Sequence, residues 1–325
     1  MPRKNAFYAQ SGGVTATIWT DTIQMFVYLA GALVCLVAVV QLLPDGVSGA
    51  MAAARAAGKL RIIDTSFDVT RPFTLWAGVI GGAFLTLATH GTDHYLVQRL
   101  LVAKSQRDAA IGLTLSGILV MAQFVLFLFL GTLFWAFYGG RPFARGDEVL
   151  PTFVSAHLPG ALIGFILAAV VAAALSPSLN SMASATVRDF YLPYFRPGAT
   201  DAQQMRVGRI FTVIWGVLQM SVAVAAQGID SALQDGLAAL SYASGPIVGA
   251  FLLGVLTRAA NSAGTMTGMI SGLALSLAVG RLAPALFGSP GVAWTWNVAI
   301  GASVTVVVGL LASRLFASGD KPPSP

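Results

Sequence analysis

The sequence predicts an all-α fold, a polytopic membrane bundle of about eight transmembrane helices. Of its 325 residues, 56% are hydrophobic and only 10% are charged, whereas a soluble domain carries roughly a quarter charged residues. The charges are clustered in short hydrophilic breaks. The apolar runs between them are long enough to cross a hydrocarbon core, which takes about 20 helical residues. This pattern excludes an ordinary soluble domain.

Eight apolar segments qualify as membrane spans by length and hydropathy. They cover residues 17–43, 75–100, 110–139, 158–184, 207–227, 233–256, 263–286 and 292–315. The break at 44–74 is long and Ala-rich, and with Arg55, Lys59 and Arg61 it is typical of an interfacial helix. We therefore expect a transmembrane domain over 17–316.

The distribution of basic residues predicts that both termini are cytoplasmic. An even number of spans puts the two ends on one side of the membrane. With the N-terminus inside, most basic residues fall in inside connections, as the positive-inside rule requires. We expect a cell-membrane protein with a cytoplasmic segment at 1–16 and a disordered cytoplasmic tail at 317–325, which is polar and Pro-rich.

The net charge of +6 does not indicate nucleic-acid binding. The Lys and Arg residues sit in the hydrophilic breaks, and no basic patch is interleaved with aromatic residues. The single cysteine, Cys35, allows no disulfide within the chain and no thiolate metal cluster. We expect the lipid bilayer and a small-molecule solute as partners.

A polar stretch at 86–94 interrupts the second span. It contains Thr86, Thr89, His90 and Asp93, together with Gly91. Polar and ionisable groups at membrane depth are costly and usually mark a pathway or site. A helix broken here would expose backbone groups, so these four polar residues are the candidate substrate site.

Two other interpretations of this stretch stay open. His90 and His94 are spaced i, i+4 with Asp93 between them, a geometry that zinc sites use, although His157 lies in a distant loop. We expect no such metal site. Capping of a helix end by Asp93 and His94 explains the stretch as well as direct contact with a substrate does.

The fourth span carries a second group of polar residues after a run of small ones. Pro177 removes one backbone hydrogen bond, and a freed carbonyl beside Ser176 and Ser178 could coordinate sodium. A kink satisfied by hydroxyl side chains is the alternative. Gln123 and Gln219 lie within spans, where such residues join helices by hydrogen bonds more often than they bind ligands.

Four stretches resemble the sodium:solute symporter family, in the order that the family has them. They are YAQSGGVTATIWTDTIQ (8–24), GTDHYLVQRLLVAKS (91–105), SPSLNSMASATVRDFY (176–191) and SGPIVGAFLLG (244–254). The second is the most specific, because a Gln-Arg pair precedes a small residue, Lys and Ser. Together they extend over nearly the whole chain.

The resemblance implies part of a five-plus-five inverted-repeat transporter fold. The first six spans correspond to core helices five to ten, and the last two are peripheral. Core helices one to four would then be missing, including the broken first helix that faces the sixth in such folds. On this interpretation the chain needs a missing N-terminal half as its partner.

The resemblance also implies residues that handle sodium, namely Asp21, Val170, Ser176 and Ser178. Two hydroxyl ligands of the family's helix eight are replaced by Ala173 and Ala174, which offer no side-chain oxygen. The only expected cofactor is Na+, and coupling to it is in question. Positions used by sugar-transporting members hold Val120 and Leu237, which argues against a sugar.

The sequence thus predicts a secondary active transporter of the sodium:solute symporter type for a small polar or anionic solute. A non-transporting membrane sensor or interaction module and a relic fragment are the alternatives. An enzyme is not expected, because intramembrane catalysis would need a paired acid and base or a metal site.

Overall fold

The computed structural model describes residues 13–93, 96–97, 100, 103–175, 177–225, 231–282, 284–285 and 291–316, and these ranges are helical with connecting loops and no strand. The predicted segment 1–16 lies mostly, and the tail 317–325 wholly, outside them. Within these described ranges, six helical stretches are long and apolar enough to cross a membrane. They are Asp21–Leu42, Gln106–Phe137, Asp201–Ala225, Leu233–Leu256, Ser262–Leu282 and Trp294–Leu315.

The two remaining predicted spans are each built from shorter consecutive helices. Segment 75–100 contains η1 (Ala77–Gly81), α4 (Gly82–Leu87) and η2 (Ala88–Thr92). Segment 158–184 contains α8 (Gly160–Leu175) and α9 (Pro177–Ala185). Residue 176, between these two helices, lies outside the described residues.

The chain divides into two compact units, of which unit 1 comprises residues 1–60 and 110–230. Its remaining helices are α2 (Gly13–Leu42), α3 (Gly46–Ala56), α6 (Gln106–Phe137), η3 (Gly146–Glu148), α7 (Val149–His157), η4 (Thr186–Phe195) and α10 (Asp201–Ala225). The helix expected in the long first break is confirmed as α3. Its buried Ala50 and Ala54 lie four residues apart on one face.

The core of unit 1 forms where α2, α3, α6 and α7 meet. Phe153 is fully buried, with its ring 4.7 Å from Phe134 and 5.5 Å from Phe137 between centroids. Val39, Leu133 and Cys35 are the other fully buried side chains of this cluster. Close aromatic pairs of this kind add stability beyond their buried area.

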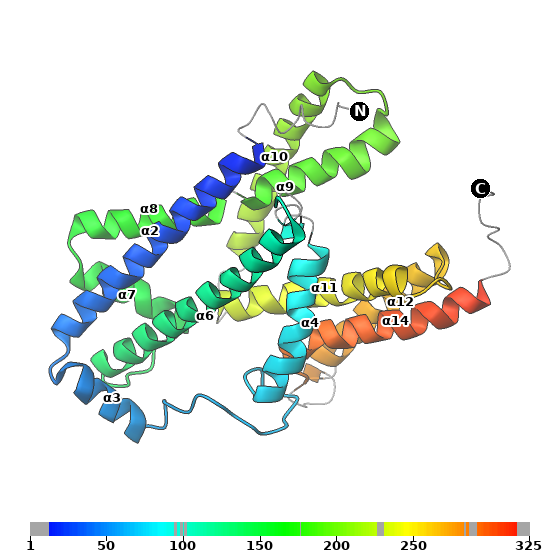
Figure 1. Ribbon diagram of the computed structural model, residues 1–325. Helices are drawn as coiled ribbons and strands as arrows, with labels where there is room; N and C mark the ends of the chain where they lie inside the picture. Colours follow the sequence, from blue (N-terminus) through cyan, green and yellow to red (C-terminus); the bar gives the residue numbers. More distant parts are fainter. Residues whose placement is uncertain are drawn as a thin grey trace. The chain divides into compact units, whose positions relative to one another are not determined.

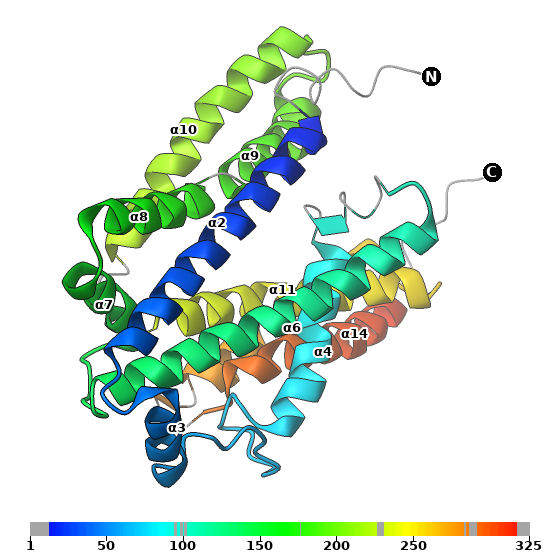
Figure 2. The same ribbon diagram turned by 60° about the vertical axis from the view of Figure 1, so that its left-hand side comes forward.

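Polar side chains join the helices of unit 1 across longer sequence separations. Gln123 Nε2 of α6 donates to the Tyr28 hydroxyl of α2 over 2.5 Å, which confirms the predicted helix-joining role of Gln123. Gln219 Nε2 lies 3.5 Å from the Met182 sulfur, so it joins α10 to α9. Figure 2 shows α10 beside α9, and these two helices are in contact.

Unit 2 comprises residues 61–109 and 231–325, with α11 (Ala232–Leu256), α12 (Ser262–Leu277), η5 (Ala278–Leu282), η6 (Trp294–Trp296) and α14 (Asn297–Leu315). α12 and α14 run alongside each other in Figure 1, and both contact α11. Glycines let the backbones approach closely: a Cβ added at Gly245 would lie 3.0 Å from Gly301 Cα. Small residues at such crossings are typical of membrane helix packing.

The contact of α11, α12 and α14 also buries polar side chains. Ser241, Ser276, Asn297 and Thr305 are completely buried. Asn297 Nδ2 donates to Ser241 Oγ over 3.1 Å, and Ser241 Oγ donates to the Ala238 carbonyl over 2.7 Å. These bonds satisfy the Asn297 amide N–H and the Ser241 hydroxyl, whereas Asn297 Oδ1 and Thr305 Oγ1 have no hydrogen-bond partner among the described residues.

Candidate functional site

The predicted break in the second span is present. η1, α4 and η2 follow one another without interruption, and the helical path ends at Asp93, whose backbone is extended (φ −73°, ψ 116°). The Asp93 N–H donates to the Ala88 carbonyl over 3.1 Å, a wide π-type turn. Single π turns of this kind occur frequently at functional sites.

Threonine side chains account for part of this local irregularity. Thr89 Oγ1 lies 3.1 Å from the Leu85 carbonyl oxygen, within hydrogen-bond distance, while Thr92 Oγ1 donates to the Ala88 carbonyl over 2.8 Å. In both contacts a threonine hydroxyl approaches the backbone carbonyl of the residue four positions before it. Such back-bonding competes with the regular ladder and often bends helices.

The broken helix is anchored to its own unit by small apolar side chains. Ala88 is buried against Val248 of α11 and against Val298 and Ala302 of α14. At the start of the helix, Gly81 lies against the Thr295 backbone carbonyl, leaving no room for a Cβ. Thr86, Thr89, His90 and Asp93 are not part of this apolar cluster.

The four predicted substrate residues differ in exposure. Thr86 and Asp93 are exposed, while Thr89 and His90 are half-buried. Their spacing of i, i+3, i+4 and i+7 is that of one helical face. The structure brings Thr89 and His90 into direct contact, since Thr89 Oγ1 lies 2.9 Å from His90 Nδ1.

The direction of the Thr89 hydroxyl decides what His90 presents to a ligand. The hydroxyl has one proton, which it can donate to a backbone carbonyl or to His90 Nδ1. If it donates to His90, neutral His90 carries its proton on Nε2 and is a donor there. If it donates to Leu85, Nδ1 keeps the proton and Nε2 is an acceptor unless the ring is protonated.

Asp93 has the contact expected of a helix cap. Its Oδ1 accepts the Leu96 N–H over 3.2 Å, and its carbonyl accepts the Val97 N–H over 2.9 Å. A carboxylate bonded to the N–H three residues later is the usual N-cap arrangement. This observation adds support to the capping interpretation, and the role of Asp93 toward a substrate stays a prediction.

The metal interpretation gains no support from the described part of the chain, in which no group of three or more His, Cys, Asp and Glu is placed to hold an ion. His94 lies outside the described residues. The four predicted substrate residues, Thr86, Thr89, His90 and Asp93, all lie within the described residues.

The predicted sodium residues all belong to unit 1. Asp21 lies half-buried in α2. Val170 lies in α8, and its side chain lines an apolar cavity together with Ile166. Ser178 belongs to α9, while Ser176, at the junction of α8 and α9, lies outside the described residues. Their predicted role in sodium handling stays a prediction.

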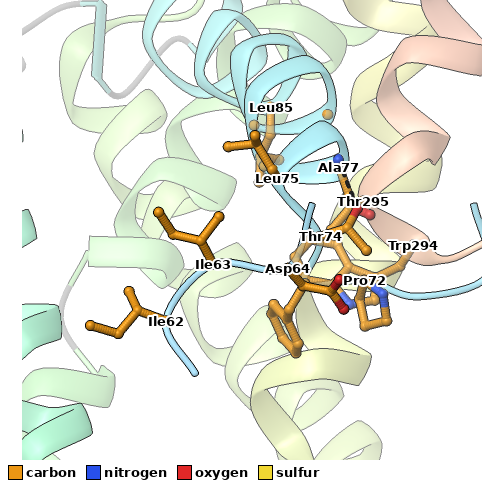
Figure 3. Close-up of a pocket in the computed structure, with 14 residues that line it drawn as sticks. Ile62, Ile63, Asp64, Pro72, Thr74, Leu75, Ala77, Leu85, Trp294 and Thr295 are labelled. Carbon is orange, nitrogen blue, oxygen red and sulfur yellow. Dashed lines mark hydrogen bonds between the residues drawn. The ribbon is translucent and has the colours of Figure 1, made fainter. Parts of the chain in front are cut away.

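A cavity of about 390 Å³, not anticipated from the sequence, lies at the start of the broken helix (Figure 3). The loop at 61–76 forms one wall, with Ile63, Asp64 and Thr74, while Trp294 and Thr295 contribute from the segment before α14. The Ala77 N–H donates to Thr74 Oγ1 over 3.2 Å, which caps the first turn.

Asp64 holds this loop together. It accepts from Arg71 Nη1 over 2.6 Å and from Arg61 Nη2 over 3.3 Å. Hydrogen bonds from Ser66, together with the charges of Arg71 and Arg61, lower the pKa of Asp64 against the opposing effect of burial. An acidic residue followed by Ser two positions later was the available sequence signal, because Asp commonly bonds the backbone there.

Residues 4–272 match the sequence pattern of the sodium:solute symporter family. The chain belongs to this family. It is 30% identical over 287 residues to the sodium-coupled monocarboxylate transporter 1 of Homo sapiens, covering 84% of this chain and 46% of that protein. It is also 30% identical over 290 residues to the Homo sapiens sodium/iodide cotransporter, covering 83% and 44%.

The fold agrees with a solved symporter. A substrate-bound, outward-open Na+-coupled sialic acid symporter superposes with a TM-score of 0.76 at 24% identity, covering 94% of this chain and 63% of that one. The chain is therefore an all-α, multi-pass membrane protein with part of the inverted-repeat symporter fold. It spans less than half the length of the two curated relatives.

Proposed function

We propose that this chain carries the helix-six side of the solute site of a sodium-coupled transporter for a small anion. The observation that supports it most directly is the broken helix, which ends in extended backbone at Asp93 within a polar stretch. Broken helices at membrane depth provide backbone groups that can bind solutes and ions.

An anionic solute fits the chemistry of the stretch and the relatives' names. Monocarboxylates and iodide, named for the two human relatives, are anions at neutral pH. An anion needs hydrogen-bond donors. Thr86 and His90 Nε2 would supply them, and Thr89 would hold His90 in the donor tautomer by donating to Nδ1.

Movement of the solute would follow from alternating access, in which one group of helices moves against another around the site. Transport rather than catalysis is proposed. The membrane would be the cell membrane with both termini cytoplasmic, on the strength of the positive-inside distribution.

Sodium is the proposed coupling ion, and its candidate residues are Asp21, Val170, Ser176 and Ser178. The alanines at 173 and 174 favour the second candidate function, a non-transporting sensor that binds solute without a strong sodium site. The two functions differ in whether sodium raises the affinity for solute.

The test is the thermal stability of the detergent-purified chain with small monocarboxylates or iodide, in sodium and in choline. A ligand that binds the folded state raises the apparent stability by mass action. A sodium-dependent shift supports symport, and a sodium-independent shift supports the sensor. No shift with any of these anions, for the chain alone and for the chain fused to a family N-terminal half, would contradict the anion site.

Matched variants locate the site. His90→Gln places an amide nitrogen near the Nε2 position and should keep most of the anion-induced shift. His90→Asn places it near Nδ1, where it keeps the Thr89 contact but should lose the shift. Thr114→Val is the control, because Thr114 is exposed on α6 and bonds only its own helix at Ala110. Equal behaviour of the two His90 variants would argue against solute contact at Nε2.

A further inference from the structure

A larger cavity, of about 510 Å³, lies within unit 1 between α2, α6, α7 and α8. Its walls are apolar and include Cys35, Phe127, Leu130 and Ile166. The volume is within the range of small-molecule sites, roughly 300–1,000 Å³. None of the residues assigned to solute on the broken helix belongs to it.

Two polar side chains face each other in this apolar lining, Tyr28 from α2 and Gln123 from α6. Gln123 Nε2 donates to the Tyr28 hydroxyl over 2.5 Å. Tyr28 therefore accepts here and keeps its own O–H proton available. Gln123 likewise keeps its carbonyl oxygen as an acceptor, because its amide nitrogen makes the contact.

Neither of these two groups has a second partner among the residues that the structure describes. The pair thus offers one donor and one acceptor side by side, and a hydroxyl group is the smallest function that satisfies both. Apolar pockets with a few convergent polar groups are the usual form of small-molecule sites, in which the polar groups set orientation.

The position along the helices restricts how a ligand arrives. Tyr28 lies within the span Asp21–Leu42, and Gln123 lies near the middle of the span Gln106–Phe137. Both therefore lie at hydrocarbon depth, where an unpaired polar group is costly. A phospholipid head group would be expensive to bring there, whereas a small apolar alcohol dissolves in the bilayer.

We propose that this cavity between α2, α6, α7 and α8 is a binding site for a small, membrane-dissolved apolar molecule that carries a hydroxyl group. The apolar body occupies the space beside Cys35, Phe127 and Leu130. The hydroxyl accepts from Tyr28 and donates to the Gln123 carbonyl. This site is separate from solute binding on unit 2 and does not depend on the proposed transport.

The experiment uses a photoactivatable octanol that carries a diazirine on its alkyl chain, with the full chain in lipid nanodiscs. Two matched probes accompany it. The methyl ether can accept a hydrogen bond but cannot donate one, and the octane analogue can do neither. We expect the octanol probe to label peptides around 28–35 and 123–130, in competition with unlabelled octanol. The ether and the alkane should label several-fold less.

Variants test the polar pair directly. Tyr28→Phe and Gln123→Leu should each weaken octanol labelling roughly two- to tenfold, the effect of losing one hydrogen bond. Both variants should leave labelling by the octane analogue unchanged. A general loss of folding would instead reduce octane labelling as well. Met121→Leu is the control, because Met121 is exposed on α6 and does not line the cavity.

Three results would overturn the proposal. Equal labelling by octanol and octane would indicate a lipid acyl chain rather than a hydroxylated ligand. Equal labelling by octanol and its ether would remove the donor requirement at Gln123. Absence of competable labelling in these peptides would mean that protein, not a small molecule, fills the cavity.

Discussion

Asn297 at the start of α14 donates through Nδ2 to Ser241 Oγ of α11 over 3.1 Å, and both side chains are completely buried. This bond joins two helices 56 residues apart in the sequence. It lies beside the close approach of Gly245 and Gly301, so a polar tie stands where the two backbones are near each other.

Replacing Asn297 by Ala should destabilise the protein by about 1–3 kcal/mol, because a buried hydrogen bond is lost and a buried partner is left with one bond fewer. Thermal or SDS-induced unfolding of the purified chain measures this. Thr267→Ala is the matched control, since Thr267 bonds only Ala263 of its own helix. Equal losses in the two variants would show that the tie contributes nothing specific.

Gly268→Ala should be destabilising by about 1–3 kcal/mol through overpacking. The added Cβ would lie 2.9 Å from Gly309 Cα on the neighbouring helix. Gly254→Ala should have the opposite sign, a gain of about 0.5–1 kcal/mol, because nothing lies within 4 Å of its added Cβ. The same unfolding assay compares them, and a stable Gly268→Ala protein would contradict the close packing of α12 on α14.

Asp93 variants separate capping from contact with solute. Asp93→Ala should cost about 0.5–2 kcal/mol of stability, since the Leu96 N–H loses its acceptor, whereas Asp93→Asn should keep the cap. If Asp93 only caps, Asp93→Asn also keeps the anion-induced thermal shift. A normal fold with an altered shift would instead assign the carboxylate to the solute or its ion.

The loop at 61–76 should loosen in acid. The pKa of Asp64 is lowered by the Ser66 hydrogen bonds, with Arg71 and Arg61 contributing. A lowered pKa stabilises the fold above the unfolded value, about 3.9, and this contribution is lost as pH falls through the folded value. Hydrogen exchange of this loop between pH 7 and pH 3 should show it opening at the acid end.

The control for the acid effect is Asp64→Asn, which removes both ion pairs. Its loop should exchange faster than wild type at pH 7 and change less toward pH 3. A loop that stays protected in the wild type at pH 3 would show that its other bonds, such as the Leu75 N–H to the Asp64 carbonyl (2.7 Å) and the Ala293 N–H to the Val69 carbonyl (2.8 Å), are sufficient without the ion pairs.

The sequence by itself determined the membrane class, the family and the position of the broken helix. Apolar runs of span length and a polar stretch at 86–94 are local features, and their physical consequence in a bilayer does not depend on which helices are neighbours. The α3 helix in the long first break and the joining role of Gln123 followed from the same local reasoning, and the interfacial position of α3 stays a prediction.

Only the tertiary structure decided which side chains meet. Asn297 with Ser241, Asp64 with Arg71 across a folded loop, and Tyr28 with Gln123 are pairs set by helix packing and loop closure. Val170, proposed from resemblance for sodium, lines a mostly apolar cavity of unit 1, and only the packing of α2, α6, α7 and α8 creates that cavity.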